Sequence, residues 1–104
     1  MIVETPVFTR RISDVLSDDQ YRMLQIHLTL CPDSGDLIPG GHGLRKVRWS
    51  GRGRGKRSGT RIIYYWDPGR MIILMVFAFR KNERSDLSKG QLKVLAAVAA
   101  QELP

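Results

Sequence analysis

Apolar and polar positions recur with two different periods along the chain, which predicts helices in the first third and strands in the middle. Between residues 18 and 31, the apolar positions Tyr21, Leu24, Leu28 and Cys31 fall on one face of a helix. From Leu44 to Trp49 the period changes to two, as in a half-buried strand. Met71 to Phe79 is apolar without interruption, which is typical of a central strand buried on both faces.

Capping signals locate the starts of three helices. Pro6 suits the first turn of a helix that continues to about Asp14. Ser17-Asp18-Asp19-Gln20 and Ser88-Lys89-Gly90-Gln91 are capping boxes, in which the serine oxygen accepts from the amide of the glutamine while the glutamine reaches back. Pro32 ends the second helix. We therefore expect two consecutive helices up to residue 31 and a closing helix after residue 88.

The predicted elements follow the order β-α-α-β-β-β-α, with Met1 to Glu4 as a short opening strand. Thr60 to Trp66 is rich in β-branched and aromatic residues, and Asp67-Pro68-Gly69 is a turn before the apolar strand. This order predicts an α+β fold: an N-terminal helical pair packed on an antiparallel sheet of three to four strands, plus a C-terminal helix. The other face of the sheet is expected to carry the basic residues.

Charge is concentrated in one part of the sequence. The chain has 104 residues, which predicts a single domain over 1–104, and a net charge of +7. The stretch between Leu37 and Trp66 contains 8 of the 17 basic residues and no carboxylate. These eight residues are Arg45, Lys46, Arg48, Arg52, Arg54, Lys56, Arg57 and Arg61. A focused positive field of this kind favours a phosphate backbone, since each neutralised phosphate releases counterions. RNA is the partner we expect first.

Other classes of function have weaker signals. The two histidines, His27 and His42, have no cluster of Cys or carboxylates near them in sequence, so no metal site is expected, and no cofactor is predicted. The single cysteine excludes an internal disulfide, which fits a cytoplasmic location. The longest apolar run is far shorter than the ~20 residues of a membrane helix, so no membrane partner is expected. His27 is expected to be a partly buried structural residue.

Four stretches of the sequence, taken in order, resemble the RelE/HigB family of bacterial toxins from type II toxin–antitoxin modules. They are GLRKVRW, GKRSGTRIIYYW, MIILMVFAF and RKNERSDLS, spanning roughly residues 43 to 95. The resemblance is closest to the HigB-like branch with a long Gly/Lys-rich loop. It implies a RelE-like fold and a ribosome-dependent endoribonuclease that cleaves translated mRNA in the ribosomal A site and inhibits translation.

The resemblance also implies roles for individual residues. The basic strand residues of the family match Lys46 and Arg48, and its arginine after the glycine turn matches Arg61. Its basic turn after the long strand matches Lys81. Asn82 stands where the best-known members have an arginine, and Ser88 stands where they have a tyrosine.

The chemistry of RNA cleavage by internal attack narrows the candidates further. It needs a base for the 2′-hydroxyl, stabilisation of the phosphorane charge and an acid for the leaving oxygen. Arg57 and Arg61 suit the second task, because a guanidinium holds two phosphate oxygens at once. Lys56 or Lys46 fits the base if neighbouring charge depresses its pKa, and Lys81 fits the acid. We group Lys56, Arg57, Arg61, Lys81 and Asn82 as catalytic candidates.

The remaining basic residues and one aromatic residue are candidates for binding RNA or the ribosome. They are Arg45, Lys46, Arg48, Arg52, Arg54 and Tyr65. Tyr65 shares a strand face with Arg61, so we expect it beside Arg61, where it can stack on a base. Tyr64 and Trp66 point the other way and are expected in the core.

Two other functions fit the sequence. One is a toxin of the same fold that acts by binding, such as ParE-like gyrase inhibition, and the other is a non-catalytic RNA-binding module. The resemblance implies mRNA in the ribosomal A site and ribosomal RNA as partners. It also implies a cognate antitoxin, HigA-like with a helix-turn-helix, through which alone the chain reaches operator DNA. Such an antitoxin should be acidic or carry an apolar segment.

Overall fold

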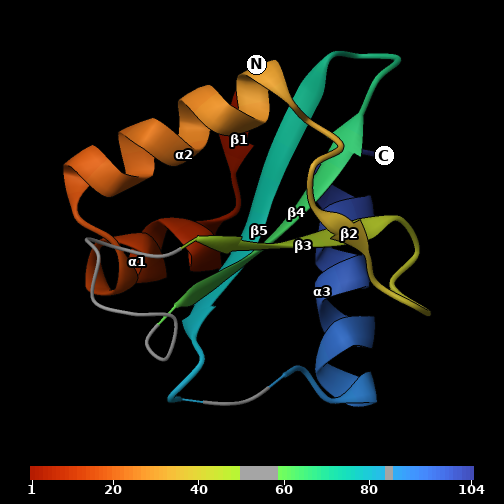
Figure 1. Cartoon of the computed structure of the whole chain (residues 1–104). Helices are drawn as coiled ribbons and strands as arrows, with labels where there is room; N and C mark the ends of the chain where they lie inside the picture. Colours follow the sequence, from red (N-terminus) through yellow and green to blue (C-terminus); the bar gives the residue numbers. More distant parts are fainter. Residues whose placement is uncertain (50–58, 84–85) are drawn as a thin grey trace.

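The computed structural model describes residues 1–49, 59–83 and 86–104, which form an α+β domain around one mixed sheet (Figure 1). The strands are β1 (Ile2–Glu4), β2 (Asp36–Leu37), β3 (Leu44–Trp49), β4 (Thr60–Asp67) and β5 (Ile72–Arg80). The helices are α1 (Pro6–Val15), α2 (Asp18–Leu30) and α3 (Lys89–Glu102). The α+β class predicted from the sequence is confirmed. No helix in the described ranges combines the length and the apolar character needed to cross a membrane.

The sheet differs from the predicted one in size and direction. It has five strands in the order β1-β5-β4-β3-β2, whereas three to four were expected. β1 pairs with β5 in parallel, with Ile2 opposite Ile73, so the sheet is mixed and not purely antiparallel. The chain returns from β1 to β5 by way of both N-terminal helices and three other strands. Parallel pairing of these two segments therefore depends on contacts far apart in sequence.

The capping residues act as their sequence predicts. Ser17 Oγ accepts from the amide of Gln20 at 3.1 Å, and the Gln20 side chain accepts from the Ser17 amide at 2.8 Å. Ser88 and Gln91 make the same pair of bonds at the start of α3. These boxes satisfy amides that a helix leaves unpaired in its first turn. The role of Ser88 in this structure is therefore to cap α3.

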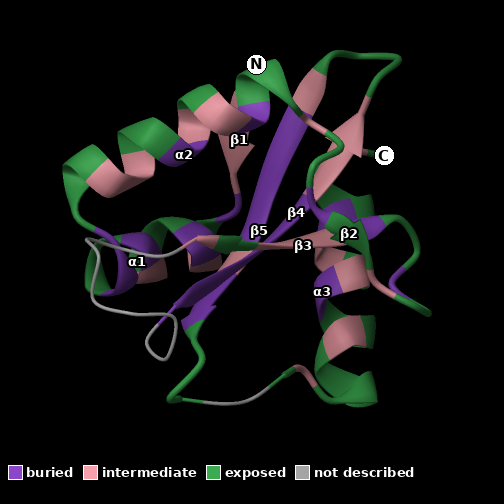
Figure 2. Ribbon diagram, in the orientation of Figure 1, coloured by how far each residue is buried: buried purple, intermediate pink, exposed green. Residues whose placement is uncertain are grey.

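Each face of the sheet carries its own buried cluster (Figure 2). On one face, Phe8 of α1 and Leu24 of α2 pack with Tyr64, which is fully buried. The Tyr64 hydroxyl donates to Pro32 O at 2.7 Å and accepts from the Gly35 amide at 2.9 Å. On the other face, Leu95 of α3 packs with apolar residues of β3, β4 and β5. That face is therefore covered mainly by apolar residues, not by basic ones as expected.

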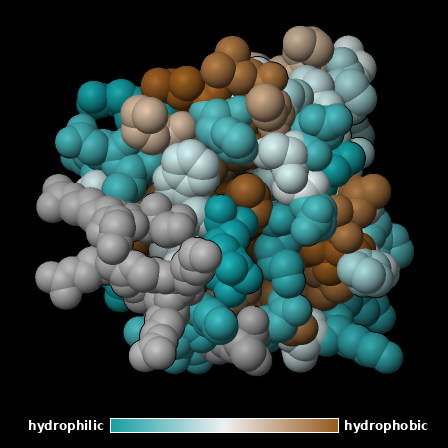
Figure 3. Space-filling model, in the orientation of Figure 1, coloured by the Kyte–Doolittle hydropathy of each residue, from teal (hydrophilic) through white to brown (hydrophobic). Residues whose placement is uncertain are grey.

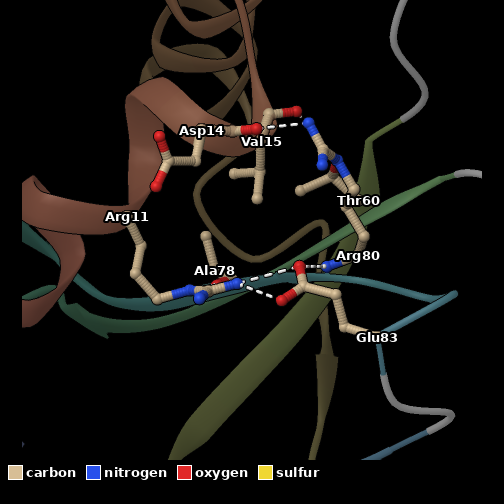
Figure 4. A network of polar contacts seen from close by, with 7 residues as sticks. All are labelled: Arg11, Asp14, Val15, Thr60, Ala78, Arg80 and Glu83. Carbon is tan, nitrogen blue, oxygen red and sulfur yellow. Dashed lines mark hydrogen bonds and ion pairs between the residues drawn. The ribbon is translucent and has the colours of Figure 1, made fainter.

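The outer edge of β5 beyond β1 is occupied by side chains. Thr5 Oγ1 donates to Val76 O at 2.8 Å, and Arg11 Nε donates to Ala78 O at 2.7 Å. Arg11 Nη2 then reaches both carboxylate oxygens of Glu83, at 2.8 and 2.7 Å (Figure 4). These contacts occupy backbone acceptors that an added strand would otherwise use.

Several apolar side chains remain at the surface. On α2, Met23, Ile26 and Leu30 are 57%, 47% and 76% exposed, and Figure 3 shows hydrophobic residues along the upper edge of the molecule, over α2. The predicted α2 stripe is correct for Leu24 and Leu28, which are buried, and wrong for Cys31, which is exposed at the C-cap. His27 is half-buried, with Nε2 3.1 Å from Ser34 Oγ, as expected of a structural residue.

Candidate nucleic-acid interface

Three cationic side chains share the sheet face that α3 covers. Alternation along β3 places Lys46 and Arg48 on the same side as Leu44, which packs under α3. Arg61 of β4 lies on the same side, and its Cα pairs directly with that of Arg48. Like charges opposite each other in a sheet repel, so this pair opposes folding locally. The arrangement is one that an anion stabilises.

Arg61 is the least solvated of the three. It is 7% exposed, and its Nη1 is 3.5 Å from Gly59 O, a long and weak hydrogen bond. Burial, and then the charge of Arg48, lower the pKa of Arg61 below its ordinary value, while Asp86 acts in the opposite direction. Within the described residues, no carboxylate forms an ion pair with Arg61. A buried guanidinium without such a counter-ion is a strong site for phosphate.

Asp86 is a carboxylate next to this cationic group. It lies two residues before the cap of α3, and its oxygens are 3.1 and 3.2 Å from Lys46 Nζ. The Leu87 amide, and after it Lys46 and Arg61, hold the pKa of Asp86 below its ordinary value despite partial burial. Lys46 is therefore an ammonium donor beside an ionised carboxylate. The contact holds the Lys46 side chain beside a carboxylate, and the role of Lys46 as general base stays a prediction.

Lys81 lies at the same end of the sheet. Its backbone amide donates to Gly59 O at 3.1 Å, the oxygen that Arg61 Nη1 also approaches. Lys81 and Asn82 are exposed in the turn that follows β5. Arg80 and Glu83 hold that turn: the Arg80 amide donates to Glu83 Oε1 at 2.9 Å, and the Arg80 guanidinium donates to Asp14 O (Figure 4). The structure thus brings the Lys81 backbone to the end of the strand that carries Arg61.

Other predicted residues lie elsewhere. Arg45 is on the opposite face of β3, where its guanidinium donates to Asp33 O at 3.2 Å and Gly35 O at 2.7 Å. Tyr65 shares a face with Arg61 but is not beside it, because fully buried Ile63 lies between them. Tyr65 is about 13 Å from Arg61 along the strand, at ~3.3 Å per residue. Four predicted residues lie outside the described residues: Arg52, Arg54, Lys56 and Arg57.

Asp86 is the member of this site that the sequence did not reveal. The capping box at Ser88 fixed where α3 begins, but it did not indicate that Asp86, two residues before Ser88, would reach back to β3. The pattern of charges gave one usable signal, since Asp86 follows a basic turn and precedes the cap. Glu83 was missed for the same reason, because its partners are more than sixty residues away or in the backbone.

No group of His, Cys, Asp and Glu side chains within the described ranges is arranged to hold a metal ion. A scan of the chain against models of protein families finds no match.

Proposed function

We propose that this chain is the toxin of a type II toxin–antitoxin module, a RelE/HigB-like endoribonuclease that cuts translated mRNA on the ribosome. The resemblance of its four sequence stretches supports the reaction type. The observation that carries the proposal is the Arg48–Arg61 pair, two arginines at directly paired positions of β3 and β4, of which Arg61 is almost fully buried. Such a pair suits the charge that develops on a phosphorane, because both forks can donate to its equatorial oxygens.

The chemistry assigns different tasks to the neighbouring cations. Arg48 and Arg61 bind the scissile phosphate and stabilise its transition state. Lys46 contacts Asp86, and an adjacent phosphate competes with that carboxylate for the Lys46 side chain. Lys56, the other base candidate, takes the proton of the attacking 2′-hydroxyl, and Lys81 supplies a proton to the leaving oxygen, since its backbone is anchored at the end of the same strand. The partners are mRNA in the A site and ribosomal RNA, and the reaction takes place in the cytoplasm.

The antitoxin needs a surface of its own. The exposed apolar residues of α2, Met23, Ile26 and Leu30, supply one that suits a protein partner. A HigA-like antitoxin with a helix-turn-helix would bring the chain to operator DNA.

Primer extension on transcripts from cells that make the protein tests the proposal. We expect cuts in phase with codons. Arg48→Ala and Arg61→Lys should each reduce cleavage by about 10²–10³-fold, because each removes one guanidinium group that would bind the phosphate. Arg61→Lys keeps a cation in a nearly buried position, and Arg48 is exposed, so both variants should fold.

Arg22→Ala is the matched control, since Arg22 is an exposed arginine on α2 that lies 3.7 Å from Asp19 and remote in sequence from the site. Cuts that persist in both site variants would overturn the assignment. DNA damage without cuts would indicate gyrase as the target. Neither effect, with retained binding to RNA, would indicate a binding module without catalysis.

A further inference from the structure

A hollow of about 300 Å³ lies at the end of the sheet remote from Arg61, between β4 and the second half of α3. Its walls include Tyr65 and His42, and three small residues of α3, Ala96, Ala99 and Ala100, also line it. Asp67 and Arg70 line the hollow as well and form an ion pair at 3.4 Å. Aromatic and apolar walls combined with polar groups are the usual composition of a small-ligand site, and this volume is at the lower end of that range.

The ring of Tyr65 has a fixed place in this hollow. Gly43, with φ of +94°, lies against the ring, and a Cβ at that position would be 2.8 Å from Tyr65 Cε1. A side chain at position 43 would therefore displace the ring, and it would also be strained in this backbone conformation. The preceding residue, His42, adopts φ of +54°, which is uncommon for a residue other than glycine. The GGHG turn thus packs against the Tyr65 ring and positions it in the wall of the hollow.

Two lysines of α3 lie next to the hollow, on the side toward Asp86. A neighbouring hollow of about 290 Å³ is lined by Lys89 and Lys93 of α3 and shares His42 with the first. Lys89 follows Asp86 by three residues, and Asp86 contacts Lys46. Along α3, Lys89 and Lys93 are followed at helical spacing by Ala96 and Ala100, so two cations lie on the flank of α3 that leads to the hollow. An RNA chain cannot run directly along β4 from Arg61 to Tyr65, because Ile63 is buried between them under α3.

We infer that the hollow at Tyr65 receives one unstacked base of a single-stranded RNA whose backbone follows the lysine flank of α3. An aromatic face is the platform on which extruded bases stack, and lysines track the phosphates between such platforms. Arg70 is held by Asp67 through Nε and by Pro104 O through Nη2, and its Nη1 is the donor for the edge of such a base. This subsite rests on the proposed function, because it assumes that RNA occupies the Arg48–Arg61 site.

Binding of a labelled, fully 2′-O-methylated ten-nucleotide RNA, measured by fluorescence anisotropy, tests the subsite without cleavage. Ala100→Phe fills the hollow, and Ala97→Phe is the matched control, since both alanines are exposed on α3 but Ala97 does not line the hollow. We expect Ala100→Phe to weaken binding by about fivefold or more, the lower range for one stacked base, and Ala97→Phe to leave it unchanged. Tyr65→Leu should weaken binding similarly while keeping apolar bulk.

A second series replaces each nucleotide in turn by an abasic one. With the native protein, an abasic nucleotide at one position of the RNA should weaken binding. With Ala100→Phe, an abasic nucleotide at that position should have no further effect. Equal binding by Ala100→Phe and Ala97→Phe, or equal tolerance of an abasic nucleotide at all positions, would overturn the subsite. Because this RNA cannot be cut, these results bear on the subsite, whereas missing transcript cleavage by the native protein bears on the proposed function.

Discussion

Replacing Arg48 by glutamine should make the protein more stable and a weaker binder of RNA. Arg48 and Arg61 face each other across β3 and β4, and Arg61 is 7% exposed, so water screens its charge poorly. Burial, and then Arg48, lower the pKa of Arg61, which has the direction expected of a disfavoured cation. Glutamine keeps much of the side-chain length but removes the repulsion. The fold then loses a repulsion between two cations, and the proposed RNA site loses one of its guanidinium groups.

The size of the gain follows from the geometry of the pair. Like charges directly opposite in a sheet cost roughly 0.2–1 kcal/mol. Because Arg61 is nearly buried while Arg48 is exposed, we expect about 0.5–1 kcal/mol in the free energy of unfolding. For a domain of about 100 residues this corresponds to a rise in Tm of roughly 2–8 °C.

Urea unfolding at low salt and at 1 M NaCl measures this gain, since urea adds no ionic strength. The gain of Arg48→Gln should shrink at high salt, where the Debye length falls to about 3 Å. Arg22→Gln is the control: it removes an attractive contact with Asp19 at 3.7 Å between exposed side chains, so it should bring no gain. If Arg48→Gln is no more stable than the native protein at low salt, or its gain is the same at 1 M NaCl, repulsion between the two arginines is refuted.

Two further substitutions test neighbouring contacts. Hydrogen bonds from the Arg80 amide, and then from Arg11 of α1, hold the pKa of Glu83 below its ordinary value of 4.5. The ionised Glu83 therefore stabilises the fold above about pH 4.5, and this stabilisation is lost as the pH falls through the lower pKa of the folded state. Glu83→Gln should therefore lower the free energy of unfolding by about 0.5–1 kcal/mol at pH 7, and melting curves should show that this loss disappears in acid. A loss that does not change with pH, or an equal loss in the exposed control Glu102→Gln, would contradict this reasoning. Asp86→Asn should tighten binding of single-stranded RNA and steepen the slope of log affinity against log salt by about 0.7, because one more phosphate contact is gained. An unchanged slope in an anisotropy titration, or the same change in the exposed control Asp18→Asn at the start of α2, would refute that competition.

Elements with local signals were predicted closely. The limits of β3 agree with its alternation, and α2 and α3 begin directly after the serines of their capping boxes. Apolar runs also identified β5, although Met71, the first residue of that run, is 64% exposed and has φ of +55° just before the strand. These features depend on residues within one or two turns of each other, so sequence alone can specify them.

Local patterns were enough to predict the α+β class, the segments that become helices and strands, and the alternation that puts Lys46 and Arg48 on one side of β3. Three features became visible only in the folded chain: β1 joins the sheet in parallel beside β5, α3 covers most of the face expected to be basic, and Asp86 reaches Lys46. Periodicity reports which side of an element is apolar. It does not report which distant element covers that side, because that choice depends on how all the apolar surfaces of the chain are buried together.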